Sequence, residues 1–301
     1  MEMNPKISGF TYVRNGLQYG YPFIASIQSV LPIVDELIVV VGDSNDGTRE
    51  AIVNLQNSKI KIIDTVWDEE NRRNGSIFAM QSNIGLQQIT GDWALHIQAD
   101  EVLHQKAAEQ LQAYIKIANQ RPDVDALVFP FLHFWGDYKH IRNTRGTHPY
   151  EVRAFKNNKP IFSYRDSQGF RAYSSYEAYL AGEEGCKLRS LKTEIDLYHY
   201  SYCRSPKLLK KKHDYAQRFW HDDQWIKENI TETPFDFNEV DRLDIFQGEH
   251  PLWMKEIIAK QDWDFKPDPS KWKMSIKNKL LSSIEKCTHK RWFSYQNYKI
   301  V

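Results

Sequence analysis

The first hundred residues alternate between short apolar runs and segments whose apolar residues recur at helical spacing. Glu36–Val41 (ELIVVV) is a continuous β-branched run, which is typical of a strand buried on both faces. Strand–helix repeats of this length predict βαβ units, and therefore an α/β fold with a mostly parallel sheet flanked by helices. The expected strands are Ile7–Val13, Glu36–Val41, Lys59–Val66 and Asp92–Ile97, and the expected helices are Tyr19–Val34, Thr48–Gln56 and Ser76–Ile89.

Beyond residue 105 the pattern is less regular. Gln105–Asn119 has helical spacing, and Asp125–Trp135 is an aromatic strand in which Pro130 suggests an edge or a bulge. From Pro206 onward the chain is helical and charged. We therefore expect a sheet-containing domain over residues 1–204 and a helical, basic C-terminal extension over residues 205–301. Further strands are expected at Thr147–Phe155, Ile161–Tyr164 and Glu194–Ser201.

Polar residues follow the expected strands directly. Asp43 comes after ELIVVVG, and Asp100 and Glu101 come after DWALHIQA. Ligands of parallel sheets bind at the carboxyl ends of the strands, so Asp43 and Asp100 could face one crevice and hold a divalent cation on a phosphate. Asp43 could instead be an ordinary turn residue, and Asp100 and Glu101 the acidic start of the next helix.

Composition narrows the class of protein. The chain has 301 residues, 41% of them hydrophobic and 13% aromatic, with a net charge of +1. This balance argues against a nucleic-acid binder, and no apolar run approaches the roughly 20 residues of a membrane span. Three scattered cysteines do not suggest a disulfide framework or a zinc site. The N-terminus does not resemble a signal peptide, so we expect a cytoplasmic protein.

The order of several segments resembles that of family 2 glycosyltransferases. TYVRN, ELIVVVGDSNDGT, an Asn-Gly segment and GDWALHIQADE follow one another as in that family. THPYEVRAFK, SYRDSQGFR and LYHYSYCRSP look like later segments of a bacterial branch. The resemblance is strongest over residues 7–103. It implies a GT-A-like catalytic domain at residues 1–204 that transfers a sugar, with inversion, from a UDP-, GDP- or dTDP-linked donor to a hydroxyl of a glycan or lipid-linked acceptor in polysaccharide biosynthesis.

The resemblance also implies roles for individual residues. Asp100 matches the retained aspartate of the family's DXD segment, which holds Mn²⁺ or Mg²⁺ on the diphosphate, and Gln98 replaces the first acid of that segment. Glutamine is neutral and a weaker ligand, so Glu101 or the late His199 could complete the metal site. His199 could instead be packed among strand tyrosines. Asp43 matches the acid that contacts the nucleotide, with Tyr12, Arg14 and Asn15 around the same base pocket.

Two further groups of residues have candidate roles. Arg72 and Arg73 could clamp the phosphates, although a charged loop is often only solvated. An inverting transfer needs one general base for the acceptor hydroxyl. Asp166 is the first candidate and Glu151 the second, with Glu183–Glu184 third; a surface salt bridge is the alternative for each.

Aromatic residues could form a platform for the acceptor sugar. We expect Trp135 to be exposed in a loop, and Phe219 and Trp220 to be part of the core. The tail, residues 271–301, has eight Lys or Arg against one Glu. Its apolar positions Ile276, Leu280, Leu281 and Ile284 fit either an interfacial helix on anionic lipid at the inner face of the membrane or a helix that covers the catalytic domain, which is the commoner case.

Other classes of protein fit part of the pattern. A nucleotidyltransferase that makes sugar nucleotides also uses a parallel sheet and metal carboxylates, but TYVRNGLQYG lacks the glycine-rich phosphate loop that such enzymes carry after the first strand. Gln98 and the many aromatics would also suit a degenerate carbohydrate-binding module without transferase activity. Nucleic acid is not an expected partner.

Overall fold

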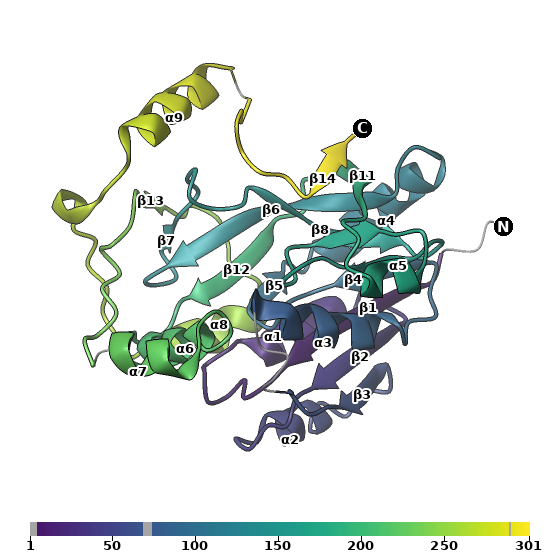
Figure 1. Cartoon of the computed structure of the whole chain (residues 1–301), viewed down its shortest axis with the longest axis horizontal. Helices are drawn as coiled ribbons and strands as arrows, with labels where there is room; N and C mark the ends of the chain where they lie inside the picture. The colour runs from purple at the N-terminus through teal and green to yellow at the C-terminus, as the bar shows by residue number, and fades with distance from the viewer. Residues whose placement is uncertain (1–4, 69–73, 231, 289) are drawn as a thin grey trace.

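The computed structural model describes residues 5–68, 74–230, 232–288 and 290–301 (Figure 1). A central sheet has the strand order β3-β2-β1-β4-β8-β6-β11-β10-β9. Its first four strands are parallel to one another, and β8 runs antiparallel between β4 and β6. The chain is thus an α/β protein, as predicted. These strands are β1 (Ile7–Val13), β2 (Glu36–Val41), β3 (Ile60–Asp64), β4 (Trp93–His96), β6 (Ala126–Trp135), β8 (Tyr150–Lys156), β9 (Ile161–Ser163), β10 (Phe170–Ala172) and β11 (Cys186–Lys192).

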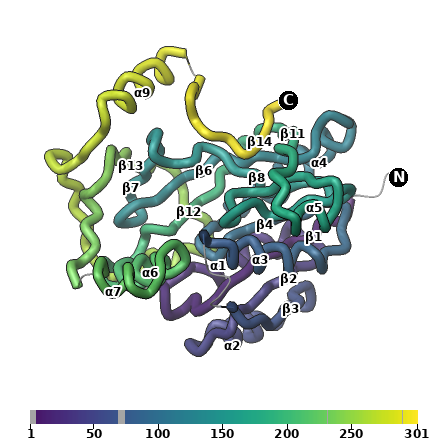
Figure 2. Tube along the Cα trace, in the orientation of Figure 1, coloured from purple at the N-terminus to yellow at the C-terminus, as the bar shows by residue number. Residues whose placement is uncertain are grey.

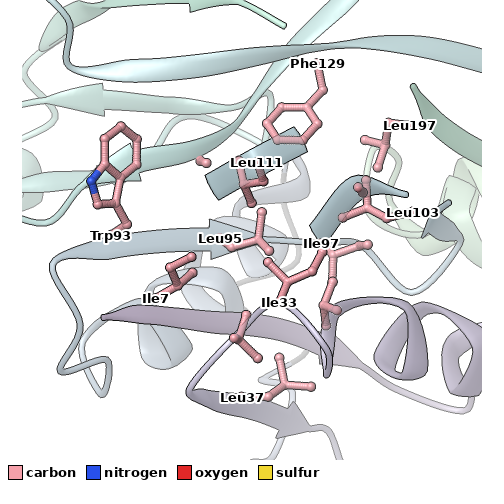
Figure 3. Packing of buried hydrophobic residues seen from close by; sticks show 14 of the residues in the cluster. Ile7, Ile33, Leu37, Trp93, Leu95, Ile97, Leu103, Leu111, Phe129 and Leu197 are labelled. Atoms are coloured by element: carbon pink, nitrogen blue, oxygen red, sulfur yellow. The ribbon is translucent and has the colours of Figure 1, made fainter. Parts of the chain in front are cut away.

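Helices cover both faces of the parallel strands. In β2 every residue is buried, because Leu37 packs with the side chains of α1 and α4 on one face and Ile38 packs with α3 on the other. Figure 3 shows the first of these clusters, with Leu37, Leu95 and Leu111 pointing into it. The helices are α1 (Phe23–Val30), α2 (Thr48–Val53), α3 (Ser76–Leu86), α4 (Ala107–Asn119) and α5 (Tyr176–Leu180).

Strand β6 is central, so of the two positions suggested by Pro130 the edge is wrong; a bulge or irregularity does shift the register of β6 against β8, between Leu127 and Val128. On one side β6 pairs with β8 along much of its length, including Pro130 with Tyr150. On its other side, β6 pairs with β11 up to Val128 and with β12 (Leu197–Tyr202) from Phe131. Pro130 therefore lies where β6 changes partner, a position where the missing N–H costs little.

The segment after residue 205 is not purely helical, contrary to the prediction. Its last strand, β14 (Tyr298–Ile300), pairs with β11 in the central sheet, so the C-terminus lies beside β11 (Figure 2). Strand β13 (Asp244–Ile245) pairs with β7 (His140–Ile141). The domain boundary at residue 204 stays a prediction. The helices of this segment are α6 (Pro206–Gln217), α7 (Asp223–Asn229), α8 (Lys255–Ala259) and α9 (Ile276–Thr288).

Helix α9 lies at the periphery of the molecule, away from the central sheet (Figure 1). It has no buried residue, and its Ile276 is 87% exposed. Of the four apolar positions, Ile276 and Leu280 are exposed, whereas Leu281 and Ile284 are half-buried, so a helix that covers the catalytic domain accounts for only part of this apolar set. Within the described ranges, no helix is both long and apolar enough to span a membrane.

Candidate active site

A pocket of about 250 Å³ opens at the carboxyl ends of the parallel strands. The ends of β1 and β4 supply Tyr12, Arg14, Gln98 and Asp100, and helix α6 covers it with Lys212. This is the edge of the sheet where the polar strand ends were expected to form a site. Much of the remaining wall is aromatic: Tyr19, Tyr21, Trp67, Phe78, Tyr215 and Phe219.

Asp100 is the central charged group of the pocket and is only 7% exposed. Its Oδ2 lies 3.3 Å from Lys212 Nζ, and its Oδ1 lies 3.8 Å from His199 Nε2. Burial alone would raise the pKa of Asp100, but the cations Lys212 and Arg204, with His199, hold it well below its ordinary range. Asp100 is therefore ionised at neutral pH. Burial, followed by repulsion from Arg204, lowers the pKa of Lys212 to about 7.

Glu101 is not brought to the pocket, so its expected role as a metal ligand is not supported by the geometry. Its carboxylate is fully buried and accepts two hydrogen bonds from Arg153, at 2.6 and 2.9 Å. It also accepts from the backbone N–H of Gln98. Residues 101–103 form strand β5, which pairs with β12, so they are not the acidic start of the following helix either. Both oxygens of Glu101 already have partners.

Asp43 lies beside the pocket and contacts two residues of its wall. Its Oδ2 accepts from Arg14 Nη2 at 2.9 Å, and its Oδ1 accepts from the backbone N–H of Trp67 at 3.1 Å. Strands β2 and β4, which precede Asp43 and Asp100, are not neighbours, because β1 lies between them. Asp100 therefore lines the pocket itself, whereas Asp43, on the other side of β1, is outside the lining and contacts only the wall residues Arg14 and Trp67.

The remaining residues expected at the donor site are placed differently. Asn15 is buried and takes part in the turn after β1, where its Oδ1 accepts from the N–H of Asn45. Gln98 lines the pocket beside Asp100. Arg72 and Arg73, the candidate phosphate clamp, lie outside the described residues.

Asp166, the first candidate for the general base, lines the pocket. Its Oδ1 is buried and has no hydrogen-bond partner among the described residues, and burial raises the pKa of its carboxyl group. The neighbouring Arg165 and Ser167 both have positive φ, at 55° and 67°. Such backbone conformations are strained and cluster at functional sites. Gly75 faces this loop, and a Cβ there would lie 2.7 Å from the Asp166 Cβ, so only glycine leaves room for it.

Glu151, the second candidate, does not line the pocket. It lies on β8 opposite Phe129 of β6, and its Oε2 is buried without a hydrogen-bond partner in the described part of the chain. Burial raises the pKa of Glu151 to about 7, against the opposing effect of Arg153. Glu151 therefore keeps its proton up to a higher pH than an ordinary glutamate, and it lies close enough to Asp166 for the two carboxyl groups to interact. Glu184 of the third pair is mostly exposed and bonds Arg171.

His199 is paired with a second histidine. His133 on β6 lies directly opposite His199 on β12, and their Nδ1 atoms are 2.9 Å apart. The His133 Nε2 lies 2.7 Å from the carbonyl oxygen of His148. Burial lowers the pKa of His133 to about 3 and also lowers the pKa of His199. Burial therefore favours the neutral form of both rings.

The protein atoms that could bind a divalent cation supply only part of the ligands that it needs. Asp100 Oδ1 and His199 Nε2 face each other, and a carboxylate with an imidazole is a normal pair of ligands for Mn²⁺. No group of three or more His, Cys, Asp or Glu that could hold a metal occurs within the described ranges. A cation at these two atoms would need substrate phosphate and water as its other ligands, which is usual for Mg²⁺ and Mn²⁺.

The sequence interpretation missed the contribution of helix α6. Lys212, Tyr215 and Ala216 line the pocket, and the hydroxyl of Tyr215 accepts a hydrogen bond from Arg14 Nη1 at 2.8 Å. These residues were assigned to an extension because their charged, helical pattern resembles any solvated helix. Only the position of the half-buried Lys212 at the pocket wall distinguishes them, and that is a tertiary property.

The aromatic predictions had mixed outcomes. Phe219 is buried in the core with Trp67 and Ile77, as expected. Trp220 is 46% exposed and was wrongly placed in the core, and Trp135 is 4% exposed and was wrongly placed at the surface. The Trp135 ring stacks on Tyr202 with ring centroids 4.0 Å apart.

The fold and the pocket together define an α/β protein with a pocket of charged and aromatic residues at the carboxyl ends of its parallel strands. The family model of glycosyl transferase family 2 matches residues 13–175, more than half of the chain. The protein therefore belongs to glycosyl transferase family 2 and is a glycosyltransferase, as the motifs predicted. No curated protein matches the sequence.

Several solved structures share part of the fold. TarS of S. aureus has 15% identity and a TM-score of 0.41, over 70% of this chain and 39% of its own. TarS 1–349 in complex with UDP-GlcNAc has 14% identity and a TM-score of 0.40, over 75% of this chain and 71% of its own. Mannosyltransferase PcManGT from Pyrobaculum calidifontis, in complex with GDP-Man and Mn²⁺, has 16% identity and a TM-score of 0.42, over 86% of this chain and 69% of its own. At such TM-scores these similarities do not indicate which nucleotide this chain binds. The chain spans well under half of the full TarS chain.

Proposed function

We propose that this glycosyltransferase moves a sugar, with inversion, from a nucleotide-sugar donor to an acceptor hydroxyl in the pocket at the carboxyl ends of β1 and β4. The observation that carries the proposal is the content of that one pocket. It holds the Asp100–Lys212 pair and, separately, the carboxylate of Asp166 with an unpartnered oxygen. A transferase needs both a site for the departing diphosphate and a base for the acceptor.

Each part of the nucleotide-sugar donor would bind next to the pocket residues that match its chemistry. Its base and ribose suit the end formed by Arg14, Trp67 and Tyr215, where aromatic faces and the Asp43–Arg14 pair are available. Its diphosphate suits the end with Lys212, whose ammonium can donate to phosphate oxygens. In a nucleotide sugar the diphosphate links the ribose to the transferred sugar, so the sugar would lie beyond the diphosphate, on the side away from the base.

The reaction would be a single displacement. The acceptor hydroxyl loses its proton to Asp166, its oxygen bonds to the anomeric carbon, and the bond from that carbon to the diphosphate oxygen breaks. The electron pair of that bond leaves with the nucleoside diphosphate. The raised pKa of Asp166 makes it a stronger base than an ordinary aspartate. Glu151 would be its alternative.

Asp100 and His199 would hold the divalent cation, Mn²⁺ or Mg²⁺. When bound, such a cation neutralises charge that develops on the leaving diphosphate. Lys212 supplies a further positive charge beside the same carboxylate. The cation is expected to bind well only with the nucleotide present, because the protein contributes two ligands.

The test is a release assay with UDP-, GDP- and dTDP-linked sugars and Mn²⁺, in which the free nucleoside diphosphate is measured. One donor should be turned over, and Asp166→Asn should reduce turnover while retaining nucleotide-dependent thermal stabilisation. Failure to bind or hydrolyse any of these donors would favour the degenerate carbohydrate-binding alternative. Formation of a sugar nucleotide and pyrophosphate from a nucleoside triphosphate would favour the nucleotidyltransferase.

We also infer that helix α9 contacts an anionic lipid surface, which would place the enzyme at the inner face of the membrane near a lipid-linked acceptor. Glu285 of α9 bonds Arg145 of the protein body at 2.7 Å. At 100° per residue, Ile276 and Leu280 lie on the side of the helix opposite Glu285. They are 87% and 62% exposed.

Ile276 and Leu280 form an apolar ridge on α9. The charges beside this ridge determine which kind of surface it fits. Lys277, Lys279 and Lys286 flank it, and the tail as a whole is strongly basic. Apolar residues between lysines are typical of helices that lie in the interface of an anionic bilayer. Cosedimentation with phosphatidylglycerol vesicles should be lost in Ile276→Asp/Leu280→Asp and should be weak with neutral phosphatidylcholine. Equal binding by the variant would refute the lipid contact, and self-association of the wild type at this ridge would replace it.

A further inference from the structure

The hydrogen bonds around His133 and His199 determine which of the two rings donates to the other. The carbonyl oxygen of His148 can only accept, so the His133 Nε2 atom, 2.7 Å away, must donate its hydrogen. A neutral imidazole carries one N–H, so the Nδ1 of His133 has a lone pair. The contact of 2.9 Å between the two Nδ1 atoms is then a hydrogen bond that His199 donates and His133 accepts.

This arrangement determines which nitrogen of His199 is free. With its hydrogen on Nδ1, the neutral His199 ring has its lone pair on Nε2. That atom lies 3.8 Å from Asp100 Oδ1, too far for a hydrogen bond, and the space between them has a lone pair on one side and a carboxylate on the other. Two electron-rich atoms that face each other in this way fit a cation between them.

The packing around His133 holds this geometry in place. The ring of Phe131, two residues earlier on β6, stacks on His133 with centroids 4.9 Å apart and an interplanar angle of 16°. The register of β6 against β12 sets His133 opposite His199, and the register of β12 against β5 sets His199 opposite Glu101. The backbone of three strands therefore fixes the rings, and neither depends on a flexible loop.

We infer that His133 is a positioning residue for the cation of the transfer reaction: it keeps His199 in the Nδ1–H tautomer, so that Nε2 and Asp100 together accept Mn²⁺ or Mg²⁺ with the donor diphosphate. This deepens the proposed function and rests on it. Without the acceptor at His133, the Nδ1–H of His199 would be unpaired, and the ring would gain by placing its hydrogen on Nε2, toward Asp100. A hydrogen at that position occupies the place of the cation.

Two substitutions at His133 separate this role from simple packing. His133→Leu removes the acceptor, whereas His133→Gln keeps one acceptor for His199 and one donor for the His148 carbonyl. His104→Leu is the matched control for loss of a histidine outside the pocket. Two-bond ¹H–¹⁵N spectra of histidine-labelled protein report the tautomer in the absence of any metal, with the His199 signals assigned by their loss in His199→Gln.

We expect the Nδ1–H form of His199 in the wild type and in His133→Gln, and the Nε2–H form in His133→Leu. Calorimetric affinity for Mn²⁺ in the presence of UDP, GDP or dTDP should fall about 10- to 100-fold in His133→Leu and be largely restored in His133→Gln. An Nε2–H tautomer in the wild type would overturn the inference. So would an unchanged Mn²⁺ affinity in His133→Leu that has switched tautomer.

The outcome is distinguishable from a failure of the proposed function. If the wild type binds no nucleoside diphosphate with Mn²⁺, the proposed function fails, and the spectra still decide the tautomer. If His133→Leu does not fold, the wild-type spectrum and the His133→Gln affinity decide the inference.

Discussion

Glu101 is the residue for which sequence and structure make opposite predictions, and Glu101→Gln tests them. By its position after Asp100 it was a candidate metal ligand. In the structure its carboxylate is fully buried and bonds Arg153, whose side chain is 3% exposed. The amide of Gln is close in size and can still accept from the N–H of Gln98, so the substitution removes the negative charge with little change in shape.

The size of the expected loss of stability in Glu101→Gln follows from the positive charge that remains on Arg153. Arg153 would stay in the core without its hydrogen-bonded counter-charge, and breaking a buried ion pair in this way costs about 3–5 kcal/mol. This is a large part of the roughly 5–15 kcal/mol that stabilises a typical domain. For a chain of this length each kcal/mol shifts Tm by roughly 2 °C, so Tm should fall by about 6–10 °C.

The assay is thermal or urea unfolding of the wild type and the variant, with Mn²⁺ affinity measured in the presence of nucleoside diphosphate. Mn²⁺ affinity, measured below the lowered Tm, should stay within about threefold of wild type. The double variant Glu101→Gln/Arg153→Met should recover much of the lost stability, because a pair of neutral groups leaves no buried charge. A variant with wild-type stability and a tenfold loss of Mn²⁺ affinity would refute the structural role and restore Glu101 as a ligand.

Three further substitutions test other parts of the protein. Asp166→Asn should lower kcat by about 10²- to 10⁴-fold. The wild-type rate should fall as pH decreases through the raised pKa of this base, above the ordinary 3.8; an acid limb near pH 7 that survives Asp166→Asn would identify Glu151 instead. Lys212→Met should weaken nucleoside diphosphate binding by about 10- to 100-fold, the value of a charge-assisted hydrogen bond, whereas the neighbouring Lys211→Met should not. Glu36 has a depressed pKa because its hydrogen bonds outweigh its burial, so it stabilises the fold above its unfolded pKa near 4.5 and loses that effect as pH falls toward the lower folded pKa. Glu36→Gln should therefore be less stable at pH 7, with a smaller deficit at pH 3 in urea unfolding; an unchanged deficit would contradict this.

Much of the parallel half of the sheet was predictable because its pattern is local. The apolar run Glu36–Val41 and the helix-spaced residues around it are short-range features, and the strand β2 has the predicted bounds. Helix ends were less accurate: α1 begins at Phe23 after Pro22, four residues later than expected. The positions of Asp100 and Asp166 near the site followed from strand ends and from family motifs.

The partners of these residues could not be predicted from the same pattern. Glu101 and Asp100 are adjacent in sequence, yet Glu101, the first residue of β5, bonds Arg153, and Asp100, just before that strand, bonds Lys212, which is 112 residues away. Likewise, His199 was a candidate ligand, but nothing in LYHYSY indicates that His133 lies opposite it. Such contacts depend on the register between strands that are distant in the chain.

The amino-acid sequence by itself determined the class of fold, the family and the edge of the sheet where the polar strand ends gather, because apolar periodicity and motif order are properties of neighbouring residues. Tertiary structure alone decided which carboxylate faces the pocket, which is neutralised in the core, and which nitrogen of His199 is free. The physical reason is that charge, burial and tautomer depend on atoms that meet across strands, and these meet only when the whole sheet has formed.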